Sequence, residues 1–268
     1  MAREIKKNFV IKCGGSTLAA LPQYFFSELV TCQQEGWAPV IIHGGGPAIS
    51  QTLDQLGIAS EFVDGLRRTS AEVLQVVEMV LAGSINKQVV RRLLSAGAKA
   101  VGLSGTDGQL LTAIPVANAD AIGYVGKVTE VNTMLLHTLL SAGYIPVIAP
   151  LGLSTEFQPY NVNADTAAAA VASALEASPF IVVTDVPGII GTVAGTKQVI
   201  RQITPSQIAA MIENGEIYGG MIPKVQAALA CLSGRVTEVV IASGDEPGVI
   251  GKILRGEPVG TTIVASGK

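Results

Sequence analysis

The 268-residue chain has few charged side chains, few aromatic side chains and only three cysteines. Charged residues make up 15% and aromatic residues 4%, so a core must be built mainly from Ala, Val, Ile and Leu. The formal net charge is −3 and the chain has no basic block with interleaved aromatics, which excludes a typical nucleic-acid-binding surface. Cys13, Cys32 and Cys231 are odd in number and lack metal-ligand spacing, so we expect reduced thiols and no protein-bound metal.

The sequence also lacks a stretch typical of a membrane-spanning helix. Its longest uncharged run, residues 131–155, is interrupted by Gly143, Pro146 and Pro150, and reads as a helix followed by a strand and a loop. The first residues, "MAREIKKN", are charged and lead directly into an apolar run, unlike a secretory signal peptide. We therefore expect a cytoplasmic protein that has no membrane partner.

Short β-branched runs alternate with helical patterns along the whole chain. This alternation predicts an α/β fold with a mainly parallel sheet. We also expect helices to end at Gly97 and Gly143, a hairpin around residues 191–195, and a helix that begins at Thr204 and Pro205. A soft boundary near residue 178 divides the chain into segments 1–178 and 179–268. The predicted strands cover residues 9–12, 39–44, 100–105, 144–152, 180–186 and 238–244.

Two of these strands end in glycine-rich loops. "KCGGS" places Lys12 before Gly14 and Gly15, and "VIIHGGGP" places three glycines after His43. Ligands of open α/β sheets bind outside the carboxyl ends of strands, where bare backbone N–H groups can approach a phosphate. For the first loop, a tight turn with a solvated lysine remains an alternative interpretation. We expect His43 to pack at the end of its strand.

Three later stretches carry further charged or amide side chains. "DGLRRTS" contains Arg67 and Arg68, and the planar guanidinium group can bind a carboxylate through two hydrogen bonds. For Arg68 a solvated loop position is favoured. "YNVNADTAAAA" places two asparagines and an aspartate at the start of an Ala-rich helix, where one of them is expected to be a cap. "YGGMIPKV" places Lys224 in the first turn of a helix, where an anionic ligand would offset its charge.

Taken together, these stretches resemble the N-acetyl-L-glutamate kinases of the amino acid kinase family over essentially the whole chain. The resemblance implies a three-layer αβα sandwich. It also implies that segment 1–178 binds N-acetyl-L-glutamate and dimerises, whereas segment 179–268 binds ATP. The matching motifs, in order, are "KCGGS", "IIHGGGP", "DGLRRT", "GLSGTDG", "YNVNADTAA", "TDVPGI" and "GGMIPKV".

The resemblance assigns catalytic roles to five residues. Lys12 would contact the transferred phosphoryl group and Lys224 the phosphates of ATP, while Asp165 would orient both lysines. Backbone N–H groups of Gly15 and Gly45 would bind the phosphoryl group from two sides. The γ-carboxylate of N-acetylglutamate is already a nucleophile at neutral pH, so the reaction requires positioning and charge neutralisation and no general base.

Binding roles follow from the same resemblance. Arg67 and Asn161 would hold the α-carboxylate, with Gly44, Gly45 and Asn163 fixing the rest of the substrate. Mg²⁺ would arrive with ATP and not in a cage made by the protein. The expected nucleotide-binding residues are Lys12, Gly14, Gly15, Thr184, Asp185, Gly220 and Lys224.

Two alternatives to this function remain. Arg68 stands where family members often have a small apolar residue, which keeps an N-acetyl-L-aminoadipate kinase of lysine biosynthesis open. A non-catalytic sensor of nucleotide or amino acid is the other alternative, although intact Lys12, Lys224 and Asp165 argue against it. Only eight residues precede the first predicted strand, fewer than the interdimer helix of arginine-sensitive members needs. We therefore expect a homodimer that arginine does not inhibit.

Overall fold

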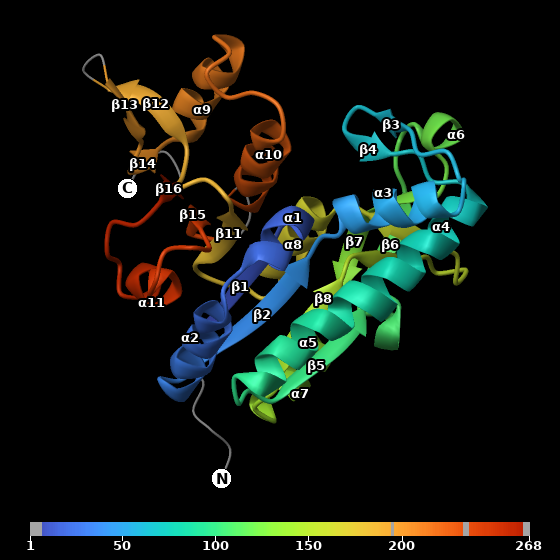
Figure 1. Cartoon of the computed structure of the whole chain (residues 1–268), viewed down its shortest axis with the longest axis horizontal. Coiled ribbons are helices and arrows are strands. Elements are labelled where there is room, and N and C mark those ends of the chain that lie inside the picture. Colours follow the sequence, from blue (N-terminus) through green and yellow to red (C-terminus); the bar gives the residue numbers. More distant parts are fainter. Residues whose placement is uncertain (1–6, 194–195, 233–235, 265–268) are drawn as a thin grey trace.

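An eight-stranded sheet runs through the middle of the molecule (Figure 1). The computed structural model describes residues 7–193, 196–232 and 236–264, so the segment before the first strand lies outside the described residues. All neighbouring strands are parallel except the pair formed by residues 238–243 and 261–264, which confirms the mainly parallel sheet. The strands lie in the order β14 (Gln202–Ile203), β16 (Thr261–Val264), β15 (Glu238–Ser243), β11 (Phe180–Thr184), β1 (Lys7–Cys13), β2 (Trp37–His43), β8 (Ile145–Ala149) and β5 (Ala100–Ser104).

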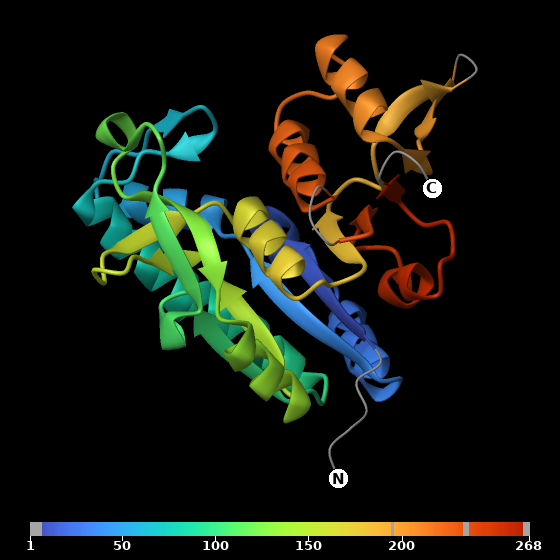
Figure 2. The same ribbon diagram turned by 180° about the vertical axis from the view of Figure 1, so that it is seen from behind.

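Helices cover both faces of this sheet, and each face has its own apolar cluster. The three layers seen in Figures 1 and 2 confirm the expected αβα sandwich. One face carries α2 (Gln23–Gln34), α11 (Val249–Leu254) and one continuous helix made of α4 (Ala71–Glu78), the π-helical η1 (Met79–Ile85) and α5 (Asn86–Ser95). The other face carries α7 (Thr133–Ser141), α8 (Ala164–Ala174), α9 (Pro205–Glu213) and α10 (Met221–Leu232).

The alternation of side chains along β1 decides where its lysine points. Phe9 and Ile11 belong to the cluster beneath α2, and Val10 belongs to the cluster beneath α8. Successive side chains of a strand point to opposite faces of the sheet. Lys12 therefore lies on the α8 side, together with Val10.

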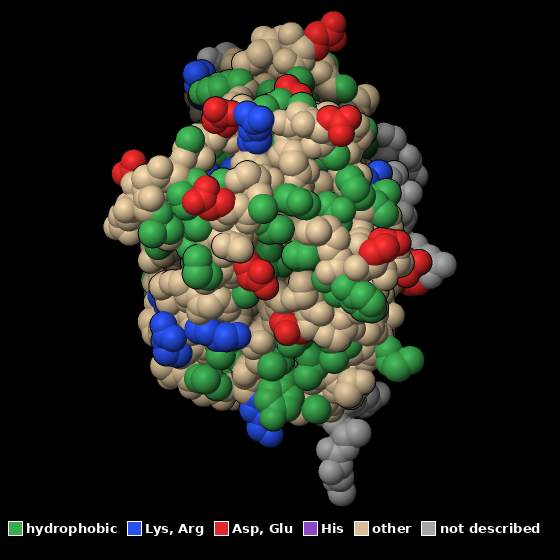
Figure 3. Space-filling view, turned by 90° about the vertical axis from the view of Figure 1, so that its right-hand side faces the viewer, with side chains coloured by type: hydrophobic (Ala, Val, Ile, Leu, Met, Phe, Trp, Pro, Cys, Tyr) green, Lys and Arg blue, Asp and Glu red, His purple; other side chains and the backbone are tan. Residues whose placement is uncertain are grey.

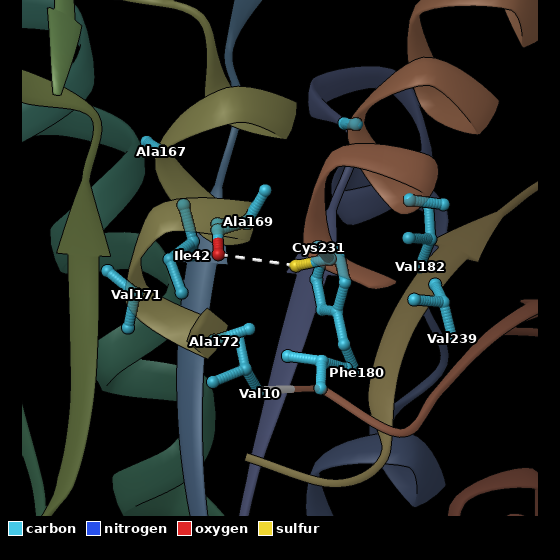
Figure 4. Packing of buried hydrophobic residues seen from close by; sticks show 14 of the residues in the cluster. Val10, Ile42, Ala167, Ala169, Val171, Ala172, Phe180, Val182, Cys231 and Val239 are labelled. Atoms are coloured by element: carbon cyan, nitrogen blue, oxygen red, sulfur yellow. Dashed lines mark hydrogen bonds between the residues drawn. The ribbon is translucent and has the colours of Figure 1, made fainter. Parts of the chain in front are cut away.

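Small side chains allow α8 to pack closely between the sheet and α10. Ala169 and Ala172 lie beside Val10 and Ile42 of the central strands (Figure 4). The Cys231 thiol of α10 donates a hydrogen bond to the Ala169 carbonyl at 3.2 Å. This packing fixes the start of α8 next to the carboxyl end of β1.

The predicted helix signals and the hairpin are confirmed. Thr204 caps α9 in a capping box with Gln207, and Gly97 and Gly143 have positive φ angles of 92° and 79°. Strands β12 (Ile190–Val193) and β13 (Thr196–Val199) pair antiparallel, whereas residues 194–195 between them lie outside the described residues.

The closed barrel and the break in one predicted strand were not predicted from the sequence. The run at residues 144–152 is two strands, because β8 ends before Pro150 and β9 (Leu151–Leu153) joins a separate closed barrel with β6 (Leu111–Pro115), β7 (Val125–Val131) and β10 (Pro159–Val162). Proline cannot donate to a ladder, which breaks the run at that point. The remaining elements are the hairpin β3 (Phe62–Val63) and β4 (Leu66–Arg67), with α1 (Gly15–Ala20), α3 (Gly46–Gln55), α6 (Ala119–Ile122) and η2 (Asp107–Gln109).

Among the described residues, one helix, Ala71–Ser95, is long and apolar enough to cross a membrane, but half of its most apolar stretch is buried inside the molecule. The face drawn in Figure 3 shows acidic and basic side chains interspersed, with no extended basic surface. All three cysteines are buried and unpaired, as expected.

The sheet continues across residue 178 through the β1–β11 pair, so the division into two segments stays a prediction.

Candidate functional site

The two glycine loops lie side by side at the carboxyl ends of β1 and β2, because Cys13 and His43 are paired in the sheet. A Cβ atom added to Gly15 would lie 2.7 Å from the Cα of Gly45. A Cβ atom added to Gly45 would lie 2.4 Å from the Ile85 side chain. Both positions therefore require bare backbone, and the resulting loops present main-chain groups to the space above the sheet.

The Lys12 ammonium lies 2.8 Å from Asp165 Oδ1, and both side chains are buried, with 4% and 10% exposed. Asp165 occupies the first turn of α8, where a carboxylate interacts favourably with the helix dipole. Asn163 caps this helix by accepting hydrogen bonds from the N–H groups of Asp165 and Thr166. One member of this group is therefore a cap, as the sequence predicted.

Lys224 brings a second, half-buried cation to the same place from the first turn of α10. Burial lowers its pKa, Lys12 lowers it further, and Asp165 and Asp185 oppose both effects. Asp165 thus acts on both lysines, and Asp185 acts on Lys224. An incoming anion would relieve the repulsion between the lysines, which is the charge arrangement expected of a phosphate site.

Two cavities meet at Lys224. The first, of about 280 Å³, is lined by both glycine loops, and the second, of about 350 Å³, lies over the carboxyl end of β11. Of the residues singled out from the sequence, the first cavity contains Lys12, Gly14, Gly15, Gly44, Gly45, Arg67, Asn161, Asn163, Asp165 and Lys224. The second contains Thr184, Asp185, Gly220 and Lys224.

Arg67 is buried at the far side of the first cavity. Its guanidinium donates hydrogen bonds to the Gly46 carbonyl at 3.1 Å, to Ser50 Oγ at 2.8 Å and to Ser60 Oγ. The same group lies 4.6 Å from the centre of the Phe62 ring. Burial lowers the pKa of Arg67, so this cation is poorly solvated and a carboxylate would be a favourable partner.

The neighbouring arginine points elsewhere. Arg68 pairs with Glu61 at 2.9 Å and its side chain is 57% exposed, so it lies on the surface as favoured from the sequence. Asn161 donates to Thr69 Oγ1 at 3.1 Å, and the Thr69 hydroxyl donates to the Arg67 carbonyl at 2.7 Å. These bonds tie the amide of β10 to the arginine-bearing strand.

His43 is buried and packs at the end of β2, as expected. Burial lowers its pKa to about 4, so the ring is neutral at physiological pH. Asn86 and Phe62 were missed from the sequence, although a polar residue in the apolar stretch "LAGSINKQVV" was a usable signal for Asn86. Among the described residues no group of three or more His, Cys, Asp or Glu side chains could hold a metal ion.

Comparisons with known proteins identify the family of the chain. The model of the amino acid kinase family matches residues 7–243. The chain belongs to this family. Among curated relatives, an acetylglutamate kinase of Halalkalibacterium halodurans is 48% identical over 95% of each chain. Another, from Geobacillus kaustophilus, is 53% identical over 89% of this chain and 90% of its own length.

A solved structure of the same fold also matches nearly the whole chain. It is the crystal structure of smu.665 from Streptococcus mutans, with a TM-score of 0.84 and 32% identity. The alignment covers 96% of this chain and 98% of that chain. The amino acid kinase fold expected from the motifs is therefore confirmed.

Gly15→Ala should destabilise the protein by on the order of 1–3 kcal/mol, because the added methyl group would overlap the backbone of Gly45. Gly46→Ala is the matched control, since a Cβ atom there meets nothing within 4 Å and the residue is the first of α3. Denaturant unfolding of the two variants measures the difference. Equal stabilities would show that the two loops do not touch.

His43 should make stability depend on pH. Its pKa is lowered from 6.5 to about 4 in the folded protein, so the unfolded chain binds more protons between these values. Stability from the neutral ring is full above pH 6.5 and is lost as the pH falls toward 4. The difference in unfolding free energy between the natural protein and His43→Asn should therefore shrink by about 2 kcal/mol from pH 7.5 to pH 5. A difference that stays constant would contradict the burial of a neutral ring.

Proposed function

We propose that this protein transfers the γ-phosphoryl group of ATP to the γ-carboxylate of N-acetyl-L-glutamate. The product is N-acetyl-L-glutamyl 5-phosphate, the second intermediate of arginine biosynthesis. One observation carries the proposal: Lys224 lines both cavities, beside the buried Lys12–Asp165 ion pair. The names of relatives that are about 50% identical over most of the chain support the same reaction.

The two cavities divide the substrates between them. N-acetyl-L-glutamate would occupy the first, with its α-carboxylate on Arg67 and Asn161 and its γ-carboxylate between the glycine loops. Gly44, Gly45 and Asn163 would fix the remainder of this substrate. ATP would occupy the second cavity, and its phosphates would reach Lys224, Lys12, Gly14 and Gly15. Its remaining contacts would be Thr184, Asp185 and Gly220.

The proposed chemistry needs no proton transfer. A γ-carboxylate oxygen forms a bond to the γ-phosphorus while the bond from that phosphorus to the β,γ-bridging oxygen breaks, and ADP leaves with the electron pair. The two lysines and the N–H groups of Gly15 and Gly45 would neutralise charge on the group in transit. Asp165 would keep Lys12 in place, at 2.8 Å.

Magnesium fits this site as a companion of ATP. Asp165 and Asp185 are the carboxylates near Lys224, and the described residues contain no cluster of three metal-ligating side chains. Mg²⁺ is commonly held by one or two carboxylates together with phosphates and water. When bound, it would neutralise charge on the phosphates.

An ADP-release assay with N-acetyl-L-glutamate, N-acetyl-L-aminoadipate and free glutamate tests the proposal. We expect turnover with the first acceptor and at least about tenfold less with the other two. Arg68 does not line the first cavity, so its charge gives no support to the longer acceptor. A preference for N-acetyl-L-aminoadipate would overturn the substrate, and absence of turnover with all three acceptors would support a sensor. We also propose that the enzyme is a cytoplasmic homodimer that arginine does not inhibit. Light scattering measures the oligomeric state, and an activity titration with arginine measures inhibition.

Lys12→Ala should lower kcat by at least about 10²-fold and change the KM for N-acetyl-L-glutamate by less than about threefold. Its charge matters most while the phosphoryl group is in transit, so its loss falls on kcat. Lys7→Ala, at the exposed start of the same strand, is the control and should keep full activity. Near-normal turnover of Lys12→Ala would remove this residue from the mechanism.

Arg67→Lys should raise the KM for N-acetyl-L-glutamate by about five- to 150-fold, which corresponds to about 1–3 kcal/mol for a charged hydrogen-bonded contact. A lysine carries a point charge and cannot replace the planar fork that binds a carboxylate. Arg68→Lys, one residue away and exposed, is the control and should leave KM unchanged. If Arg68→Lys raises KM and Arg67→Lys does not, the α-carboxylate is bound elsewhere.

A further inference from the structure

The π-helical segment η1 packs against the second glycine loop, and its Leu81 also lines the first cavity. A Cβ atom added to Gly45 would lie only 2.5 Å from the Leu81 side chain and 2.4 Å from the Ile85 side chain. Asn86 follows immediately and is fully buried at the end of β2. π-Helical turns inside α-helices occur frequently at functional sites. The proposed mechanism assigns no role to any of these three residues.

Hydrogen bonds fix the orientation of the Asn86 amide. Its Oδ1 accepts from the Lys87 ammonium at 3.0 Å, and its NH₂ group donates to the Val147 carbonyl at 2.9 Å and to the Leu103 carbonyl at 3.2 Å. The same NH₂ group lies 3.2 Å from His43 Nε2. Gly102 leaves room for this amide, because a Cβ atom there would lie 1.9 Å from Oδ1.

The amide in turn fixes the tautomer of His43. Asn86 Nδ2 can only donate, so Nε2 of the neutral imidazole accepts and the proton lies on Nδ1. Nδ1 lies 3.1 Å from the Gly44 carbonyl oxygen and donates to it. A chain of hydrogen bonds therefore runs from Asn86 through His43 to the peptide that joins Gly44 and Gly45.

That peptide plane also carries the N–H group of Gly45. In a trans peptide the C=O and N–H groups point in opposite directions. Holding the Gly44 carbonyl on His43 directs the Gly45 N–H away from the core. A Cβ atom on Gly15 would lie 2.8 Å from Gly45 N, so this nitrogen lies on the side of the first loop.

We propose that His43 and Asn86 are positioning residues for phosphoryl transfer, because they hold the Gly44–Gly45 peptide with its N–H directed at the transferring group. This inference rests on the proposed function. Leu81 and Ile85 pack closely against Gly45 of the same peptide. Because the N–H group would act on charge that develops during transfer, misplacing it should lower kcat and leave KM unchanged.

Two substitutions of His43 separate this role from simple packing. His43→Asn keeps an amide donor near the Nδ1 position but loses the partner of Asn86. His43→Gln keeps an acceptor near the Nε2 position for Asn86 but loses the donor to the Gly44 carbonyl. We expect kcat to fall about tenfold or more in His43→Gln and about threefold or less in His43→Asn, although His43→Gln should melt at the higher temperature.

The packing of η1 against Gly45 is tested by Ile85→Val, which shortens the side chain that lies nearest to Gly45. It should lower kcat about threefold at unchanged KM. Ile145→Val, in the buried start of β8, is the control and should leave kcat unchanged. This pair keeps the test decisive if the His43 variants do not fold.

Hydrogen exchange of residues 43–50 gives a readout that does not need turnover. His43→Gln should exchange at least about threefold faster than His43→Asn in this segment. If the variant with the lower melting temperature also has the lower kcat, or if the substitutions raise KM and leave kcat unchanged, His43 is not a positioning residue. Absence of turnover in the natural protein would instead refute the proposed function, and the exchange rates would still report on the peptide.

Discussion

The buried ion pair between Lys12 and Asp165 is the interaction on which the rest of the site depends. Buried pairs contribute little net stability, because desolvation offsets their attraction, but removing one partner leaves an uncompensated charge in the interior. The pair joins the end of β1 to the start of α8 at 2.8 Å. A lysine at this position is explained by what it can bind, and not by what it adds to stability.

The surrounding structure keeps this cation ready for an anion. Alternation along β1 directs Lys12 toward α8, and the small side chains of α8 let that helix approach the sheet closely. Lys224 adds a second cation. Its pKa is lowered by burial and by Lys12, so the two lysines repel each other until an anion arrives. The fold thus places charge where a phosphoryl group would pass between the two cavities.

Much of this arrangement could be predicted from the sequence, because it depends on local patterns. The strand runs, the glycine loops, the Thr204 cap and the exposure of Arg68 each follow from a few adjacent residues. The barrel could not be predicted, since strands as short as β9 (Leu151–Leu153) carry no usable periodicity. The contact of Ile85 with Gly45 joins distant segments, and no spacing in the sequence indicates it.

A crystal structure with ADP, N-acetyl-L-glutamate and a planar phosphoryl mimic such as aluminium fluoride would show whether the group in transit lies on the Lys12–Asp165 pair. We expect the mimic to lie between the two glycine loops, within hydrogen-bond distance of the Gly15 and Gly45 N–H groups and in contact with both lysines. ADP should lie over the carboxyl end of β11. A mimic bound away from Lys12, or an acceptor whose α-carboxylate does not reach Arg67, would contradict it.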